Sequence, residues 1–552
     1  RNVYGTLASI ISTDEKYEYA IEIALGGYLQ NIVVQDESDA KDIIDYLKQN
    51  MLGRATFLPL WLIKDTKFDL KNKVSKLQGV VGIASDLVKY DSKFEKVINL
   101  ALGSTVIVDN LENAIKISKN FRNSVRIVTL DGELIATTGS ITGGQTSKNK
   151  TGLLGRAEKI QKLKEKIEEK QNKLINQILN IDFEQIGNLY ENTKHEVEFG
   201  NSKIEPINYL EKDKISNEDF KKFDDIGTDI IKNGKFAVVT MAGGQGTRLG
   251  HKGPKGTYDL GLDSHKSIFE ILCDTLKKAK EDYGTYVQWY IMTSEENNKQ
   301  TVEFFEENNY FGYDKNKVMF FKQGQLPMCD TKGKLVIDEN GLIKEAADGH
   351  GGVFESMRKD AVIDDMKQKG IEWAFIGGVD NVLAKMVDSV LIGMSIANNV
   401  PAAGKSVVKA GPEERVGVFC KRNGKPSVIE YTEITNEMAE AKDENGELIY
   451  GESHILCNLF SVNAIDEISK NKLPYHSAFK KAKYINEKGE LVVPEKPNAY
   501  KFEAFLFDAF ESLSDMAIMR VKREEEFAPV KNAEGVDSPE TARELYKNFH
   551  KN

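Results

Sequence analysis

The stretch FAVVTMAGGQGTRLGHKGPKG, residues 236–256, decides the class of fold. Its first six residues are apolar or β-branched, which is typical of a buried parallel strand, and they run directly into a glycine-rich turn. Glycine has no Cβ, so the backbone N–H groups of such a turn can converge on the oxygens of a phosphate group. The stretch therefore predicts a strand that ends in an anion-binding loop.

Two cationic residues accompany these glycines, Arg248 within the loop and Lys255 directly after Pro254. Arginine offers a planar fork of donors and lysine a movable point charge. Both are useful if a triphosphate is attacked at its α-phosphorus, because negative charge then grows on the departing pyrophosphate. The spacing does not match GxGxxG, since Leu249 occupies the third glycine, and no GK[ST] follows. We predict phosphate binding by a different kind of loop.

Outward from the loop, apolar runs alternate with helical patterns. Strand-like runs follow at 287–293, 318–321 and 373–379, and helical patterns lie at 267–280 and 297–308. Strands separated by helices form βαβ units on a mostly parallel sheet, which binds ligands beyond the carboxyl ends of its strands. The second half is therefore expected to be an α/β fold with the glycine loop at its ligand-binding edge.

A carboxylate, Asp380, follows the last of these strand-like runs. At the carboxyl edge of a buried parallel strand it would face the ligand crevice, and it would suit Mg²⁺, a hard ion that prefers oxygen ligands. The alternative is that Asp380 caps the next helix. Its position in the sequence leaves both interpretations open.

Composition narrows the class of protein. The chain has 552 residues, 40% of them hydrophobic and 29% charged, with 44 Gly and 12 Pro, which excludes collagen and wholesale disorder and predicts two or more domains. No apolar run is long enough to span a membrane. The four cysteines form no CxxC pair, so neither a disulfide framework nor a zinc knuckle is expected, and a cytoplasmic location is predicted.

The net charge of −10 disfavours duplex nucleic acid as the main partner of the acidic part. Because the chain opens on Arg1, we expect a longer reading frame.

The first 150 residues contain an internal repeat. ALGG at 24–27 with IVV at 32–34 recurs as ALGS at 101–104 with VIV at 106–108. Each copy reads as a helix that ends at glycine, a short strand, and a second helix that opens at Asp36 or Asn110. Two copies indicate one pseudo-symmetric domain. This half has no histidine, cysteine or carboxylate cluster, which favours a structural or assembly role.

Four ordered motifs in this half resemble the hinge domain of bacterial SMC chromosome-partition proteins. They are GTLAS at 5–9, AIEIALGG at 20–27, GRATFLPL at 53–60, and TLDG at 129–132 leading to TGG at 142–144. The resemblance covers residues 1–157 and implies an α+β domain that forms a homodimer, with late glycines that let two backbones approach. DNA contact is expected through this half only. An alternative for Gly139, Gly143 and Gly144 is a loop that needs positive φ.

Apolar residues at heptad spacing follow the hinge-like part. Leu153, Ile160, Leu163, Ile167 and Leu174 alternate in four- and three-residue steps among Lys and Glu. The pattern indicates a short coiled-coil-like helix or a solvated helix that links domains. No phosphate loop of the ATPase type and no long heptad array follows, so SMC motor activity is excluded. We expect three parts, at 1–157, 158–180 and 181–552.

The last part resembles the UDP-sugar pyrophosphorylase family, in particular its UDP-N-acetylglucosamine branch. In family order, the resemblance is carried by GGQGTRLG with PKG, QGQLP at 323–327, DGHGG at 348–352, VDN at 379–381, VIEY at 428–431, LPYH at 473–476, PN at 497–498 with KFE at 501–503, and REEEF at 523–527. The resemblance implies a GT-A-type nucleotidyltransferase domain that joins UTP and a sugar 1-phosphate, with Mg²⁺, into a UDP-sugar and pyrophosphate.

The resemblance also implies a role for each matching residue. The nucleotide-binding residues would be Gly243, Gly244, Gly246, Thr247, Gln323 and Gly349, with Gln323 reading the uracil edge. The catalytic cations would be Arg248, Lys255 and Lys501. The sugar-binding residues would be His350, Glu430 and Asn458, and Asp380 would bind the metal. For Asn458 the alternative is a strand amide satisfied by backbone, and for Lys501 a solvated surface charge.

Two departures from the family pattern leave the sugar open. His350 stands where many relatives have asparagine, and NAYK at 498–501 replaces the common NGIK. Glucose, N-acetylglucosamine and N-acetylgalactosamine 1-phosphates all remain candidates. His454 and His476 are expected to be packing or exposed residues, since no zinc spacing and no nucleophile motif is found.

A function from a different class remains as the alternative. The chain would then be a dimerisation module of chromosome organisation, and its α/β half would be a fused passenger.

Overall fold

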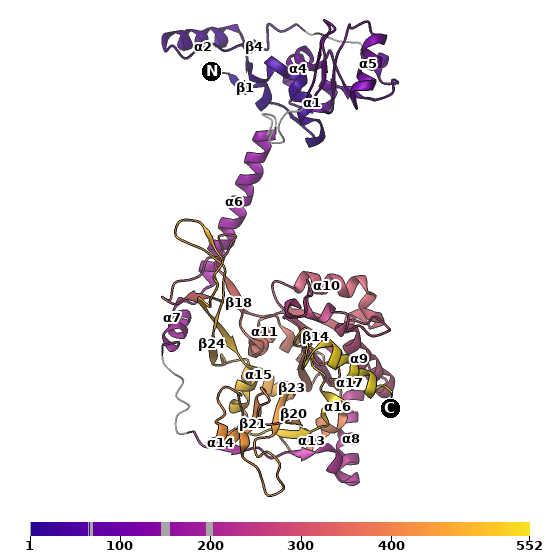
Figure 1. Ribbon diagram of the computed structural model, residues 1–552, viewed down its shortest axis with the longest axis vertical. Helices are drawn as coiled ribbons and strands as arrows, with labels where there is room; N and C mark the ends of the chain where they lie inside the picture. The colour runs from indigo at the N-terminus through magenta and orange to yellow at the C-terminus, as the bar shows by residue number, and fades with distance from the viewer. Residues whose placement is uncertain (1, 65, 67–69, 145–154, 195–201, 552) are drawn as a thin grey trace. The chain divides into compact units, whose positions relative to one another are not determined.

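The computed structural model describes residues 2–64, 66, 70–144, 155–194 and 202–551. The chain divides into two compact units, Arg1–Lys173 and Leu174–Asn552. Helix α6 (Gly155–Asn180) runs from one unit into the other (Figure 1). Within the described residues, no helix combines the length and apolar character that a membrane span requires. The four cysteines are buried and form no disulfide.

A large mixed sheet forms the centre of the second unit. Its main path runs, in spatial order, through β12 (Leu210–Glu211), β28 (Ala517–Arg520), β20 (Ala402–Val408), β23 (Glu452–Ser461), β19 (Trp373–Gly378), β13 (Phe236–Met241), β14 (Gln288–Thr293) and β15 (Val318–Lys322). Strands β19, β13, β14 and β15 are parallel, whereas β23 is antiparallel to both of its neighbours. The four expected strands are all present, and the predicted α/β fold is confirmed, with a mixed sheet.

Helices cover this sheet on both faces, so alternate residues of a strand belong to different hydrophobic cores. Val238 joins a core with helices α8 (Asn217–Lys232), α9 (Ile268–Tyr283) and α13 (Ser389–Ala397). Val239 joins the opposite core with α11 (Val353–Lys359), α12 (Val362–Gln368) and α15 (Val462–Ile468). A strand buried on both faces needs apolar residues at every position, which explains why 236–241 reads as a continuous apolar run.

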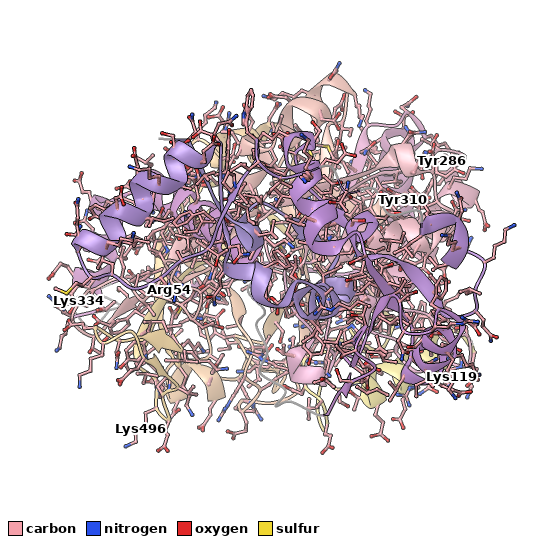
Figure 2. All side chains as sticks on the ribbon, turned by 90° about the horizontal axis from the view of Figure 1, so that it is seen from above. Arg54, Lys119, Tyr286, Tyr310, Lys334 and Lys496 are labelled. Atoms are coloured by element: carbon pink, nitrogen blue, oxygen red, sulfur yellow. The ribbon has the colours of Figure 1, made fainter. Side chains whose placement is uncertain are left out.

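Peripheral elements complete the second unit. They are α7 (Phe183–Asn192), α10 (Asn298–Glu307), α16 (Arg523–Glu526), α17 (Pro539–Phe549), and a small sheet of β17 (Cys329–Asp330), β27 (Ala499–Ala504) and β24 (Tyr475–Lys480). Tyr286 and Tyr310 pack at the edge of the core that contains α9, whereas Lys334 pairs with Glu487 on the surface (Figure 2).

The first unit contains the predicted repeat. Helix α1 (Glu15–Leu25), β3 (Ile32–Val34) and α2 (Glu37–Gln49) correspond to α4 (Glu95–Leu102), β7 (Thr105–Val108) and α5 (Leu111–Asn120). Asp36 accepts from Asp39 N and Asn110 from Asn113 N, so both second helices open at the expected residues. The remaining described strands are β1 (Val3–Thr6), β2 (Ser12–Thr13), β4 (Phe57–Pro59), β5 (Val80–Ile83), β6 (Val88–Lys89), β8 (Arg126–Thr129), β9 (Leu134–Ile135) and β10 (Ile141–Thr142).

The late glycines and the heptad residues take definite conformations. Gly139 and Gly144 have φ of +86° and +135°, which favours glycine, and a Cβ on Gly143 would press on Glu133. In α6, Ile160, Leu163 and Ile167 are more than half exposed. Leu153 lies outside the described residues. A helix with an exposed apolar stripe either remains in solvent or packs against a partner helix.

Candidate active site

The glycine loop is closed by a short antiparallel bridge between Gln245 and Pro254. Gly246 N donates to Gly253 O at 2.9 Å, and Lys255 N donates to Gly244 O at 3.0 Å. The bridge follows β13 directly and turns the chain back, so that Lys255 lies beside the loop although eleven residues of sequence separate it from Gly244. The predicted loop and its lysine thus form one structural unit.

A buried amide fixes this loop to the neighbouring strand. Asn297 is fully buried and donates through Nδ2 to Ala242 O at 3.0 Å and to Gly244 O at 3.4 Å. Its Oδ1 accepts from Ser294 N at 2.8 Å. Asn297 was not singled out from the sequence, and its only local signal is the Ser-x-x-Asn turn before α10. It holds the loop by backbone contacts that sequence spacing does not reveal.

The two loop cations lack a counter-charge among the residues that the structure describes. Arg248 is exposed and Lys255 is half-buried. Among the described residues, no carboxylate forms an ion pair with either side chain, although carboxylates outnumber cations in the whole chain by ten. Cations that no described carboxylate pairs with create a local positive potential beside the glycine-rich loop, which attracts a polyanion.

Three of the residues predicted to bind the nucleotide meet although they come from distant segments. Gln323 follows β15, and its Nε2 donates to Gly349 O at 3.0 Å. A Cβ on Gly243 would overlap the Gln323 carbonyl oxygen, and one on Gly349 would overlap the backbone of Ala504. Gly349 also has a φ of +89°. Only glycine fits at Gly349, because its φ is positive and the clash is with backbone, whereas a side chain at position 243 would displace the Gln323 amide.

A buried carboxyl group, Asp348, lies between two more glycines of this region. A Cβ on either Gly324 or Gly352 would overlap its oxygens, and Oδ1 has no hydrogen-bond partner among the described residues. Burial raises the pKa of Asp348 to about 6. No sequence pattern gives Asp348 a role of its own, since burial by glycine backbones is a property of the fold.

The predicted sugar-binding histidine, His350, is held in one neutral form. Its Nδ1 accepts from Leu506 N at 3.0 Å, and its ring packs against Phe505 with centroids 5.5 Å apart. Burial lowers the pKa of His350 to about 4. The imidazole is therefore neutral at pH 7, with its proton on Nε2.

Asn458 presents an unsatisfied donor. It is fully buried in β23, and its Oδ1 lies 3.2 Å from Nε2 of His454. Its Nδ2 has no hydrogen-bond partner in the described part of the chain. Burial lowers the pKa of His454 to about 3, so neutral His454 donates to Asn458 while its ring packs against Phe419 and Phe507. The alternative of an amide satisfied by backbone is wrong, because half of this amide is unpaired.

Two further predicted residues have acidic neighbours. Burial and the Glu433 carboxylate raise the pKa of Glu430. Lys501, in β27, forms a 2.5 Å ion pair with Glu503 and is about three-quarters buried, so the alternative of a solvated surface charge is wrong. His476 stacks on Phe505 and bonds Asp508 at 2.9 Å, which raises the pKa of His476.

Asp380 lies at the carboxyl end of β19, beside β13. The next described helix, α13, has Asp388 as its N-cap residue, so the interpretation of Asp380 as a helix cap is wrong. No hydrogen bond or ion pair to its carboxylate is found among the described residues, and its backbone O accepts from Val530 N at 2.9 Å. Asn381 fixes this edge, since Nδ2 donates to Glu526 O and Oδ1 accepts from Ala528 N.

The donor set at Asp380 fits a hard cation. A half-buried carboxylate without a protein partner offers oxygen ligands, which Mg²⁺ prefers. No group of three or more metal-ligating side chains is found in the described ranges, so other ligands of such an ion would come from substrate phosphates and water.

Comparison with known proteins agrees with this geometry. Residues 181–537 match the family model described as UTP–glucose-1-phosphate uridylyltransferase, which is more than half of the chain. The chain belongs to this family. It is therefore a nucleotidyltransferase, and the resemblance of its second half to UDP-sugar pyrophosphorylases is confirmed. Residues 1–118 match the family model of the SMC flexible hinge domain, which confirms the resemblance of the first half.

Members of the uridylyltransferase family supply the similar sequences and structures. A probable UDP-N-acetylglucosamine pyrophosphorylase of Dictyostelium discoideum is 39% identical over 364 residues, 62% of this chain and 75% of the relative. The UDP-N-acetylglucosamine pyrophosphorylase of Saccharomyces cerevisiae is 39% identical over 334 residues, 58% of this chain and 70% of the relative. The crystal structure of a putative UDP-N-acetylglucosamine pyrophosphorylase from Entamoeba histolytica has a TM-score of 0.58 at 32% identity, covering 63% of this chain and 88% of that one.

Asp348 makes the stability of the uridylyltransferase unit depend on pH. Its folded-state pKa of about 6 exceeds the unfolded value of about 3.9, so its contribution to stability is complete below the unfolded pKa and is lost as pH rises through the folded pKa. The parent should lose this stability as the pH rises, whereas Asp348→Asn should not. We therefore expect the free energy of unfolding of Asp348→Asn, relative to that of the parent, to increase by on the order of 3 kcal/mol between about pH 4 and about pH 7.

Urea unfolding followed by tryptophan fluorescence measures this difference. A Trp61→Phe background leaves Trp289 and Trp373, both in the second unit, as the only tryptophans. Asp225→Asn, which replaces an exposed carboxyl group on α8, is the matched control and should leave the pH profile unchanged. Parallel profiles for the parent and Asp348→Asn would show that the Asp348 pKa is not raised.

Proposed function

We propose that the second unit transfers the uridylyl group of UTP to a sugar 1-phosphate and releases pyrophosphate. The observation that carries the proposal is the closed glycine loop with two unpaired cations, Arg248 and Lys255. Gly243, Gly244, Gly246 and Thr247 would provide backbone contacts to the phosphates. The ordering of β13, β14 and β19 around this loop supports a GT-A-type nucleotide-binding domain.

Chemistry of this kind needs no protein base. An ionised oxygen of the sugar phosphate attacks the α-phosphorus, the bond to the β-phosphate oxygen breaks, and pyrophosphate leaves with the electron pair. The chain's task is to position two anions that repel each other and to stabilise the charge of the leaving group. Arg248 and Lys255 would take the leaving pyrophosphate, and Lys501 would exchange Glu503 for the sugar phosphate. Asp380 would hold Mg²⁺, which supplies further charge neutralisation when bound.

Uridine and sugar would lie on opposite sides of these phosphates. Gln323 and Gly349 would contact the uracil, in keeping with their hydrogen bond and with the approach of the Gln323 side chain to Gly243. Asn458 Nδ2 is a buried donor that an acetamido or hydroxyl oxygen of the sugar would satisfy. His350 Nε2–H and the Glu430 carboxyl group would complete the sugar site.

The relatives favour N-acetylglucosamine 1-phosphate over glucose 1-phosphate, because those with 39% identity are described as UDP-N-acetylglucosamine pyrophosphorylases. With UTP and Mg²⁺, we expect kcat/KM for N-acetylglucosamine 1-phosphate to exceed that for glucose 1-phosphate by at least about tenfold, which corresponds to one polar contact. A panel of sugar 1-phosphates and nucleoside triphosphates, assayed by UDP-sugar formation, measures this preference. No UDP-sugar from any pair would refute the proposed activity.

Lys255 provides a direct test of the loop. Removing a cation that stabilises the leaving group in the transition state costs about a hundredfold or more in kcat. We therefore expect that loss for Lys255→Ala, with an unchanged circular dichroism spectrum. Lys252→Ala is the matched control, because Lys252 is an exposed lysine of the same turn and should remain near the parent rate. Near-parental pyrophosphate release by Lys255→Ala would remove Lys255 from the mechanism.

The first unit supports a second function, which we propose to be self-association through its terminal strand. Strand β10 ends the sheet order β10-β9-β8-β7-β5, so one of its edges has no partner among the described residues. Ile141 in β10 is 56% exposed. An exposed strand edge next to glycines is suited to pairing with another copy. Binding of DNA stays a prediction for this unit only.

Light scattering coupled to size exclusion tests the association on the full chain. We expect a dimer at micromolar concentration and a shift toward monomer for Ile141→Lys. Val493→Lys adds the same charge at an exposed apolar position of the second unit and should stay dimeric. A monomeric parent chain, or a dimer untouched by Ile141→Lys, would overturn this assignment of the interface.

A further inference from the structure

A second cavity lies in the uridylyltransferase unit away from the glycine loop. Its volume is about 630 Å³, and it lies between α9, the segment 382–387, α16 and α17. None of its lining residues belongs to the predicted nucleotide, sugar or metal sites. A cavity of this size is large enough for a small organic molecule.

Most of the cavity wall is apolar. Ile271 and Ala279 of α9 face Val382, Leu383 and Met386 of the opposite segment, and Tyr546 of α17 adds an aromatic face. Such a wall favours a ligand with an apolar body, because burying apolar surface contributes roughly 25 cal/mol per Å².

The carboxylates that line the cavity already have lysine partners. These pairs are Asp274 with Lys266 and Lys277, Asp282 with Lys278, Glu525 with Lys522, and Glu526 with Lys212 and Lys405. The cavity therefore offers no unpaired acidic group to a cationic ligand.

One lysine of the lining is only weakly compensated. Lys385 is the single exposed residue in the buried run 381–390, and its ammonium lies 3.7 Å from Asp388 Oδ1. Asp388 is itself buried, and its Oδ2 lies 2.8 Å from the fully buried ammonium of Lys405. With Lys212 and Glu526, three lysines share two carboxylates, so one positive charge is in excess.

The shift in the pKa of Lys385 agrees with an excess of positive charge around it. Although the Lys385 side chain is 48% exposed, the packed wall around it removes part of the hydration of its ammonium, which lowers its pKa, and the ammonium groups of Lys212 and Lys405 lower it further. Asp388 only partly opposes this effect. An anion that reached Lys385 would therefore stabilise its charged form.

We propose that this cavity is a binding site for a small organic anion, with its acidic group on Lys385 and its apolar or aromatic body between α9 and the segment 382–387. The acidic group can be a carboxylate, sulfonate or phosphate, since each accepts charge-assisted hydrogen bonds from an ammonium. The wall segment follows Asp380 and Asn381 directly in the chain, so the cavity lies next to the segment that is proposed to bind the metal.

Anilinonaphthalene sulfonate is a suitable probe, because it joins a sulfonate to an aromatic body and fluoresces in apolar surroundings. Titrated with the full folded chain, it should bind with saturation at one site per chain. Lys385→Gln should weaken that binding by about tenfold, the value of one charge-assisted hydrogen bond. Lys221→Gln is the matched control, since it removes the same charge from an exposed position of α8 outside the cavity lining, and it should bind like the parent.

Two further measurements locate the bound probe. Thr275→Phe, which places a ring in the cavity from a half-exposed position of α9, should abolish binding while the circular dichroism melt is retained. UTP with Mg²⁺ should not displace the probe. Displacement by UTP, unchanged binding by Lys385→Gln, or no saturable binding would each overturn the proposal. None of these readouts requires uridylyl transfer, so failure of the cavity proposal is distinct from failure of the proposed activity.

Discussion

Two backbone hydrogen bonds, from Gly246 N to Gly253 O and from Lys255 N to Gly244 O, fold the glycine loop back on itself. They bring a lysine to the loop without any counter-charge from a carboxylate among the described residues. Asn297, at the start of α10, anchors the same loop, and the Gln323 side chain packs directly against Gly243. The anion-binding character of the unit depends on this arrangement, because an acidic chain attracts a triphosphate only where cations remain unpaired.

Buried polar groups fix the other side of the site. Asn381 binds the backbone of residues 526 and 528, which holds the end of β19 where Asp380 emerges. Lys405 is fully buried and pairs with Asp388 and Glu526, and breaking a buried pair of this kind leaves a charge that water cannot reach. The same ion cluster borders the second cavity. Glu526 links the two regions, since its backbone O accepts from Asn381 at the proposed metal edge and its side chain lines the cavity.

Much of this architecture could be predicted from the sequence. Continuous apolar runs identified β13, β14, β15 and β19, because strands buried on both faces tolerate few polar residues. The glycine spacing, Arg248 and Lys255 identified the loop, because these residues lie close together in the chain. Other residues could not be found in this way. Asn297 and Asp348 matter through contacts with segments that are distant in sequence, and neither belongs to a spacing pattern with a chemical meaning.

The sequence by itself determined the class of fold, the repeat in the first unit and the presence of a glycine-rich turn, since each depends on local periodicity or on residue types adjacent in the chain. Only the tertiary structure decided which polar groups remain unsatisfied. Asn458 is left with a free buried donor, Asp380 with an unpaired carboxylate and Lys385 with a shared partner, because burial and charge compensation arise when distant strands and helices pack together.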